Sequence, residues 1–362
     1  MMSEPVAAGA DLAESAQDAG LSYTSDSEPG IRRVRKGRGF VYIDADGHKV
    51  RDAPTLTRIR SLVIPPAWKE VWICARPRGH LQATGRDDRG RKQSIYHVKW
   101  RETRDADKYA RLLGFARALP RIRARVARDM RLRGLPRDKV TATIVKLLES
   151  TFARVGNEEY ARDNRSFGLT TLRDRHVKVT GPNVRFMFRG KSGRDIEVGV
   201  TNRRVASVVK RCEELPGQML FQYVDESGTR GTIRSDDVNS YLREASGEDF
   251  TAKDFRTWAG TVLAASALRD LAHFESETEA EHNVAAAIDS VARKLGHTRA
   301  ICRRAYVHPA VIDRYLDGSL DSALSLERAT EGRRLRTDEA AVLALLKRAA
   351  RAQSLKRSAR AA

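Results

Sequence analysis

The chain has 362 residues, with 67 Lys and Arg against 47 Asp and Glu, so its formal net charge is +20. At this length, and with 41% hydrophobic residues, it can bury the cores of two domains without disulfide support. The basic excess favours a polyanionic partner, most simply nucleic acid. No apolar run reaches the roughly 20 residues of a membrane-spanning helix, so we expect no membrane partner.

The cysteines argue against both a disulfide framework and a zinc site. Cys74, Cys212 and Cys302 are odd in number, far apart, and form no Cys-x-x-Cys pair. The first residues are acidic and lack the apolar segment of a signal peptide. We therefore expect a cytoplasmic protein with no metal or other cofactor.

The first 29 residues differ in composition from the rest of the chain. Residues 1–29 contain six acids and neither Lys nor Arg, and they are rich in Ala, Ser and Gly. Few of their side chains are large and apolar. This composition predicts a disordered acidic tail.

Residues 30–101 are predicted to form a small, mainly β domain. Its Asp44-Ala45-Asp46-Gly47 segment resembles the start of a calcium-binding loop, but such a loop needs a glutamate where Thr55 stands. A hairpin turn is therefore favoured there. The expected strands are Phe40–Ile43, His48–Val50, Val71–Cys74 and Gly79–Thr84.

Residues 102–330 are predicted to form a larger, mainly α domain, which makes the fold class α+β. An apolar helical face between Val140 and Val155 predicts a helix that ends near Gly156. Thr251 with Asp254 predicts a helix start, and Gly296 closes a helix over residues 277–295. A β-meander is expected at 176–180, 184–189 and 194–200, and a basic C-terminal helix or tail at 331–362.

The segment Gly85 to Lys92 spaces its glycines like a phosphate-binding P-loop. Arg91 and Lys92 follow the second glycine, whereas a P-loop requires Lys and then Ser or Thr. Nucleotide hydrolysis is therefore not predicted. The segment is interpreted instead as a basic loop that touches DNA phosphates.

Five residues supply what metal-free cleavage of a phosphodiester needs. The reaction requires a side-chain nucleophile, fixed cationic donors for the growing charge, and an acid for the departing oxygen. Each candidate alone has an ordinary structural explanation, so the information lies in their order and spacing. The candidates are Arg154, Lys191, Arg256, His297 and Tyr306.

With these residues the chain resembles the type IB DNA topoisomerases of the poxvirus and bacterial kind, from about residue 32 to 318. In the first domain the resemblance rests on Ile64-Pro65-Pro66-Ala67-Trp68, Gly79-His80-Leu81-Gln82-Ala83-Thr84-Gly85 and Gly90-Arg91-Lys92-Gln93 leading to Tyr96-His97. In the second it rests on Arg154-Val155-Gly156-Asn157, Ser166-Phe167-Gly168-Leu169-Thr170-Thr171-Leu172, Gly190-Lys191, Phe255-Arg256-Thr257-Trp258, Gly296-His297-Thr298 and Arg304-Ala305-Tyr306.

The resemblance implies a specific role for each candidate. Tyr306 would be the nucleophile that forms a 3′-phosphotyrosyl bond, and Lys191 would protonate the leaving 5′-oxygen. The non-bridging oxygens would be held by Arg154, Arg256 and His297. Religation would need neither ATP nor metal, and swivelling of the cut strand would release supercoils.

The resemblance also implies a bilobed DNA clamp formed by a monomer associated with the nucleoid. Residues 30–101 would cover one face of double-stranded DNA, and residues 102–330 would hold the active site. The family usually has a DNA-contacting tyrosine where this chain has Ser94, so Tyr96 would take over that contact or site preference would weaken. The DNA-binding candidates are Gln82, Arg89, Arg91, Lys92, Gln93 and Tyr96.

Two other functions are compatible with parts of this pattern. A site-specific tyrosine recombinase shares the chemistry, but its usual histidine three residues before the second arginine is replaced here by Lys253. Its helical core-binding domain also fits the β-rich first domain poorly. A non-enzymatic architectural DNA-binding protein would need only the positive charge.

Overall fold

The computed structural model describes residues 6–37, 39–271, 274–325 and 335–361. The protein is a mixture of helices and strands, and it divides into two compact units, Met1–Tyr109 and Ala110–Ala362. The boundary expected between residues 101 and 102 falls inside one helix, α3 (Val98–Asp129), so the division lies eight residues later than expected.

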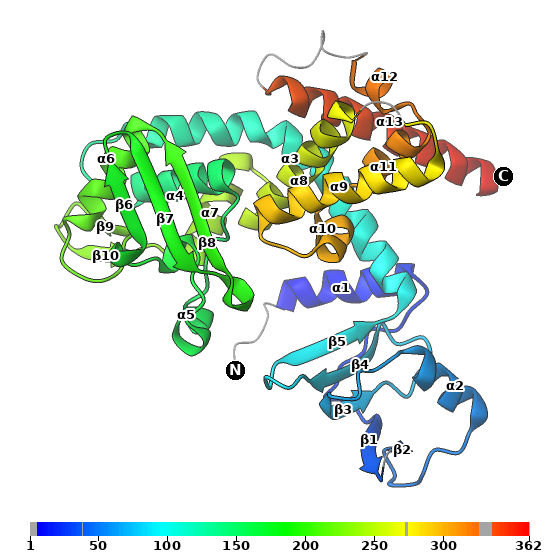
Figure 1. The fold of residues 1–362 in the computed structure, drawn as a ribbon. Helices are drawn as coiled ribbons and strands as arrows, with labels where there is room; N and C mark the ends of the chain where they lie inside the picture. The colour runs from blue at the N-terminus through cyan, green and yellow to red at the C-terminus, as the bar shows by residue number, and fades with distance from the viewer. Residues whose placement is uncertain (1–5, 38, 272–273, 326–334, 362) are drawn as a thin grey trace. The chain divides into compact units, whose positions relative to one another are not determined.

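The first unit contains a small antiparallel sheet, as predicted. Its strand order is β2-β1-β3-β4-β5, and a short helix, α2 (Ala53–Ser61), supplies Ile59 to the core (Figure 1). Ile31, Val71, Ile73 and Ala83 from the strands complete that core. The strands are β1 (Ile31–Lys36), β2 (Gly39–Ile43), β3 (Lys69–Ile73), β4 (Leu81–Arg86) and β5 (Lys92–Tyr96).

The disorder expected for the first 29 residues is wrong for residues 6–29; residues 1–5 lie outside the described residues. A helix, α1 (Val6–Asp18), is followed by a segment that packs on the sheet. Ala16 and Leu21 form an apolar cluster with Trp100. These few apolar side chains are buried against Trp100, which is 84 positions from Ala16 and 79 from Leu21, and composition cannot reveal such contacts.

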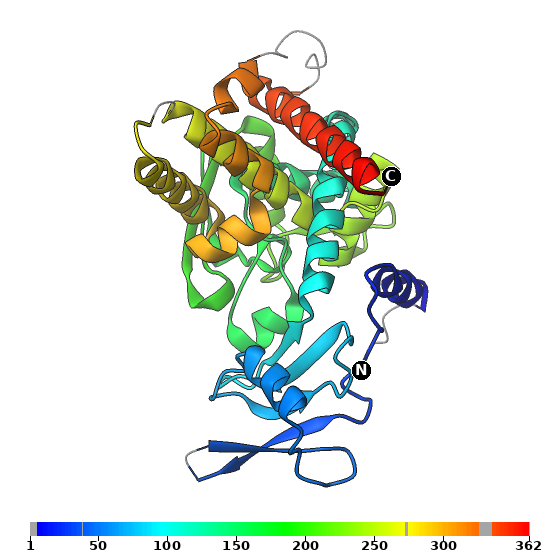
Figure 2. The same cartoon turned by 90° about the vertical axis from the view of Figure 1, so that its right-hand side faces the viewer.

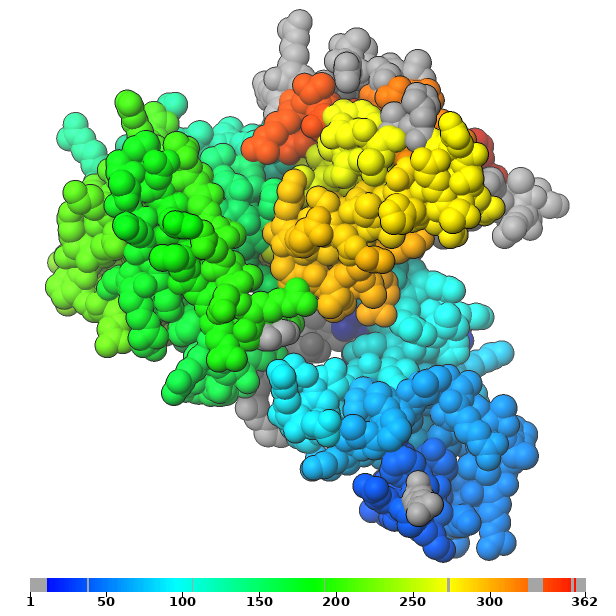
Figure 3. Space-filling model, in the orientation of Figure 1, coloured from blue at the N-terminus to red at the C-terminus, as the bar shows by residue number. Residues whose placement is uncertain are grey.

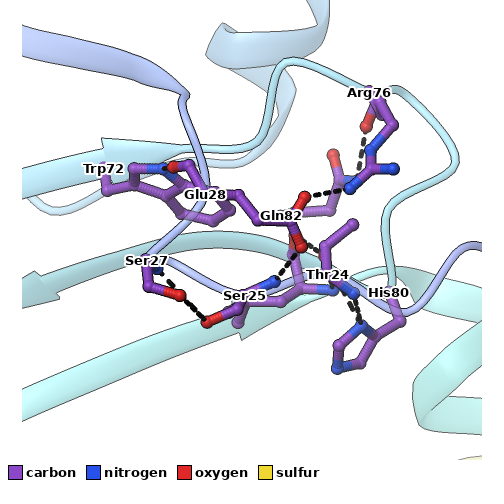
Figure 4. A network of polar contacts seen from close by, with 9 residues as sticks. Thr24, Ser25, Ser27, Glu28, Trp72, Arg76, His80 and Gln82 are labelled. Atoms are coloured by element: carbon purple, nitrogen blue, oxygen red, sulfur yellow. Dashed lines mark hydrogen bonds and ion pairs between the residues drawn. The ribbon is translucent and has the colours of Figure 1, made fainter. Parts of the chain in front are cut away.

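Polar contacts fix the end of this N-terminal segment, as Figure 4 shows. The Thr24 amide donates a hydrogen bond to Nδ1 of His80, at 2.9 Å. The Trp72 indole donates to the Glu28 carbonyl, and Glu28 pairs with Arg76. Residues 22–28 therefore belong to the first unit as firmly as its strands do.

The second unit is mainly helical and includes the predicted β-meander. Strands β6 (Val177–Thr180), β7 (Asn183–Arg189) and β8 (Asp195–Thr201) form an antiparallel sheet in that order. Val184, Phe186 and Phe188 of β7 point into the core. Figure 3 shows the surface on which this sheet (green) and the later helices (yellow to orange) are exposed.

The helices of the second unit supply the rest of its core. Strands β9 (Gln222–Val224) and β10 (Arg230–Thr232) form an additional hairpin. Besides α3, which crosses the boundary, the longer helices are α4 (Arg137–Thr151), α6 (Arg203–Glu213), α7 (Ser235–Ser246), α8 (Ala252–Asp270) and α9 (Glu277–Leu295). The shorter ones are α5 (Glu158–Asn164), α10 (Arg299–Tyr306), α11 (Pro309–Leu316) and α12 (Leu320–Ser325).

The C-terminal helix, α13 (Thr337–Ala361), lies within the predicted range 331–362 but is not a separate tail. Residues 340–346 are all buried, and the helix contacts α8, α11 and α12 (Figure 2). Glu339, at the start of α13, pairs with Arg123 of α3. The first half of α13 is therefore part of the core of the second unit.

Candidate active site

Arg154 lies in an extended segment that follows α4. The helix ends at Thr151, earlier than predicted, because Phe152 adopts the left-handed conformation (φ 56°). The Leu169 amide donates to the Arg154 carbonyl at 2.9 Å, which fixes the backbone of this segment. Gly156 and Gly168 allow the two segments to cross, since a Cβ on Gly168 would lie 2.6 Å from the Gly156 Cα.

Arg256 is the most buried member of the site, with 5% of its surface exposed. It lies in the first turns of α8, where the Asp254 carboxylate accepts the Thr251 amide and caps the helix as predicted. Its guanidinium donates to the carbonyls of Phe152 and Leu295. These carbonyls lie at the ends of α4 and α9, where they have no hydrogen-bond donor within the helix. Burial and the neighbouring Arg154 charge lower the pKa of Arg256 to about 10, so it keeps its charge at neutral pH.

His297 follows α9, which closes at Gly296 in the left-handed conformation, as predicted. Its Nε2 lies 3.1 Å from Nη2 of Arg154 and 3.0 Å from Nη2 of Arg256. Burial, followed by the charges of these two arginines, lowers the pKa of His297 to about 3. The imidazole is therefore neutral at physiological pH and accepts hydrogen bonds at Nε2.

Tyr306 is the last residue of α10, the short helix that Thr298 caps. Its ring centroid lies 4.4 Å from that of His297, and the Arg256 guanidinium carbon lies 5.5 Å from the ring centroid. Cys302, one turn earlier, is fully buried, and burial raises the pKa of its thiol to about 11. Cys302 is thus a packing residue here.

Lys191 is exposed in the turn between β7 and β8, flanked by Gly190 and Gly193. It lines a cavity of about 380 Å³ together with Arg154 and Arg256. A second hollow, of about 500 Å³, shares part of this wall. Additional cations at the two hollows are Arg165, Arg175, Arg189, Arg293 and Lys294.

The structure brings five of the six expected DNA-binding residues to one exposed hairpin. Asp87 organises the loop between β4 and β5 by accepting from the backbone and side chain of Arg91, and these bonds lower its pKa to about 2. Gln93 also donates to Asp87. A strand rather than a helix follows the loop, so this segment is not a P-loop, as predicted. Arg89 and Tyr96 are exposed on the same hairpin.

The assignment of Gln82 to DNA binding is contradicted by its burial. Only 2% of its surface is exposed. Its amide nitrogen donates to the Gly79 carbonyl at 2.7 Å, and its amide oxygen accepts from Arg58 at 2.8 Å. Gln82 shapes the turn before β4. Sequence reasoning also missed Asp26, whose carboxylate lies 2.6 Å from the Lys92 ammonium.

One group of possible metal ligands occurs among the described residues: Asp44, Asp46 and His48. Asp44 Oδ1 accepts the amides of Asp46 and His48, which is the hydrogen bonding of a hairpin turn. The predicted turn is thus confirmed, but the expected strand His48–Val50 is reduced to an isolated bridge between Lys49 and Ile43. Within the described ranges, no helix combines the length and apolar character needed to cross a membrane.

A tyrosine, a histidine and two arginines converge in the second unit: Tyr306, His297, Arg154 and Arg256. A family model described as the catalytic core of eukaryotic DNA topoisomerase I matches residues 97–330. A second model, the N-terminal domain of bacterial DNA topoisomerase IB, matches residues 39–87. This chain belongs to the type IB DNA topoisomerases.

Two viral relatives illustrate the similarity. DNA topoisomerase 1B of Acanthamoeba polyphaga mimivirus is 32% identical over 79% of this chain and 87% of its own length. DNA topoisomerase 1B of Vaccinia virus (strain Copenhagen) is 21% identical over 69% of this chain and 76% of its own length. The similarity therefore extends over most of each protein.

Proposed function

We propose that this topoisomerase cuts one strand of duplex DNA through Tyr306. The phenol oxygen attacks phosphorus, the bond from phosphorus to the 5′-oxygen breaks, and a 3′-phosphotyrosyl ester and a free 5′-hydroxyl result. The observation that carries this proposal is the packing of the Tyr306 ring against both the His297 imidazole and the Arg256 guanidinium.

The other candidates stabilise the charge that develops in this step. Arg154 and Arg256 both direct a guanidinium nitrogen at His297 in the free enzyme. A phosphate at this point replaces His297 as their acceptor, and each donor lost costs a factor of roughly 100 to 1000 in rate. Lys191 gives its proton to the leaving oxygen. Because the ester retains the energy of the broken bond, religation after strand swivelling needs no ATP.

The cations around the site provide a path for the DNA backbone. Arg165, Arg175 and Arg189 line the hollow beside the catalytic cavity. The first unit offers Arg89, Lys92 and Tyr96 on its β4–β5 hairpin, and we propose that the two units form a clamp around the duplex as a monomer. The proposed location is the cytoplasm, in association with the nucleoid.

The experiment is relaxation of negatively and positively supercoiled plasmid in EDTA without ATP, comparing the wild type with Tyr306→Phe. The wild type should relax both substrates. The variant should bind DNA with unchanged affinity but form no covalent adduct, because only one hydroxyl is lost.

Each alternative outcome changes a specific part of the proposal. Equal relaxation by Tyr306→Phe would exclude Tyr306 as the nucleophile. A wild type that requires paired specific sites would be a recombinase, and one that binds without cleaving would be an architectural protein.

A further inference from the structure

Helix α8 contacts the nucleophile segment directly, one turn after Arg256. Thr261 of α8 is fully buried, and its hydroxyl lies 3.2 Å from the Tyr306 carbonyl oxygen. The same hydroxyl accepts the His308 amide at 3.2 Å. The hydroxyl has two carbonyl acceptors within reach of its one proton, those of Thr257 at 3.0 Å and Tyr306 at 3.2 Å.

These contacts occur where the backbone needs a partner. Tyr306 ends α10, and Val307 continues in an extended conformation (φ −116°, ψ 125°). The last carbonyls of a helix and the amides beyond it have no partner within the helix. Thr261 satisfies one group of each kind, on either side of Val307.

Gly260 makes this close approach possible. A Cβ at this position would lie 2.5 Å from the Tyr306 carbonyl oxygen and 2.9 Å from the Tyr306 Cβ. A contact of that length involves backbone and would have to move the end of α10. Gly260 and Thr261 therefore hold Tyr306 from adjacent positions on α8.

Arg256 belongs to the same helix, so α8 carries both an oxyanion donor and the residues that hold the nucleophile. We propose that Gly260 and Thr261 are positioning residues that set the distance from Tyr306 to Arg256 and His297 during strand cleavage. This proposal rests on the proposed role of Tyr306. A misplacement of about 1 Å at a reacting atom reduces rate by roughly 100-fold.

The test is the single-turnover cleavage rate of a duplex with one scissile site, with Thr261→Val compared with Thr261→Ser. Valine keeps the shape and removes the hydroxyl, so cleavage should slow by about 10- to 100-fold. Serine keeps the hydroxyl and should restore the rate to within about threefold. DNA affinity should be unchanged in both. A 5′-bridging sulfur, which leaves without protonation, should not restore the valine variant.

A matched control is Thr143→Val. Thr143 is also fully buried and donates to a carbonyl of its own helix, that of Lys139 at 2.9 Å, but it does not touch Tyr306. Its variant should cleave at the wild-type rate. If Thr261→Val does not fold, Gly260→Ala takes its place and should slow cleavage at least tenfold.

The outcomes separate this inference from the proposed function. The positioning role would be overturned by a loss of cleavage rate that Thr143→Val shares or that Thr261→Ser does not recover. It would also be overturned if Thr261→Val, or Gly260→Ala in its place, cleaved at the wild-type rate. Cleavage by Tyr306→Phe would instead overturn the nucleophile assignment itself.

Discussion

At the scale of single residues, burial distinguishes the members of the site better than charge does. Arg256 is 5% exposed and bonds to two helix ends, whereas Lys191 is exposed in a turn. The sequence predicted the presence of both residues, by motif and by resemblance. It did not predict that Arg256 has a structural function, because the Phe152 and Leu295 carbonyls that it satisfies are 104 and 39 positions away.

His297 should make stability depend on pH. Its pKa of about 3 in the folded protein lies below the ordinary histidine value of 6.5. Between these values the unfolded chain binds the extra proton, so stability falls as pH falls and is fully present above pH 6.5. In His297→Gln this dependence is absent. The free energies of unfolding of the wild type and the variant are measured in urea at pH 7 and at pH 5. The difference, wild type minus variant, should be smaller at pH 5 by about 1 to 2 kcal/mol. An advantage that stays constant would mean that His297 titrates normally in the folded protein.

At the scale of elements, local signals located helices α4, α8, α9 and α13 and the meander. The caps at Thr251 and Gly296 are as predicted, because each depends on residues within one turn. The end of α4 and the ordered segment before β1 were not predicted. Both depend on contacts with distant residues, such as Leu169 with Arg154 and His80 with Thr24.

The ion pairs of α13 should contribute measurably to stability. Glu339 is 6% exposed and accepts two bonds from Arg123, which also bonds to Glu149. Glu339→Gln leaves the partly buried Arg123 with less compensation for its charge and should lower the free energy of unfolding by about 3 kcal/mol. Thermal or urea unfolding measures this change.

An exposed ion pair in the same unit provides the comparison. Asp163 and Arg162 form a contact of 2.9 Å with both side chains largely exposed. Asp163→Asn should change the free energy of unfolding by less than about 1 kcal/mol. Equal losses in Asp163→Asn and Glu339→Gln would show that burial of the α13 pair is unimportant.

At the scale of the whole molecule, the charge is unevenly distributed along the chain. The net charge is +20, yet the charged side chains of residues 1–29 are all acidic. One of those acids, Asp26, forms an ion pair with Lys92 and also accepts a hydrogen bond from the Thr84 hydroxyl. A DNA phosphate that approaches this hairpin therefore competes with a carboxylate already in place.

Asp26→Asn should strengthen DNA binding, because Lys92 becomes available to phosphate. We expect a gain of about 3- to 10-fold at low salt that diminishes as salt rises, since contacts with phosphate weaken in salt. Titration of a labelled duplex at several salt concentrations measures it. The control is Asp46→Asn, which changes the net charge by the same amount at the β1–β2 side of the unit. It should give a smaller gain in DNA affinity than Asp26→Asn. Equal gains would mean that net charge alone explains the effect.

The position of Arg256 between the ends of α4 and α9 also determines when the enzyme can injure its own substrate. The proposed nucleophile, Tyr306, lies 50 positions from Arg256 and 152 positions from Arg154, and these side chains meet only when the helix ends are docked. On the proposed mechanism, a chain that opens locally at α9 would still hold DNA by charge, but Tyr306 would be separated from the groups that activate the phosphate. We therefore expect damage to the fold to produce an inert DNA-bound protein rather than an uncontrolled nuclease.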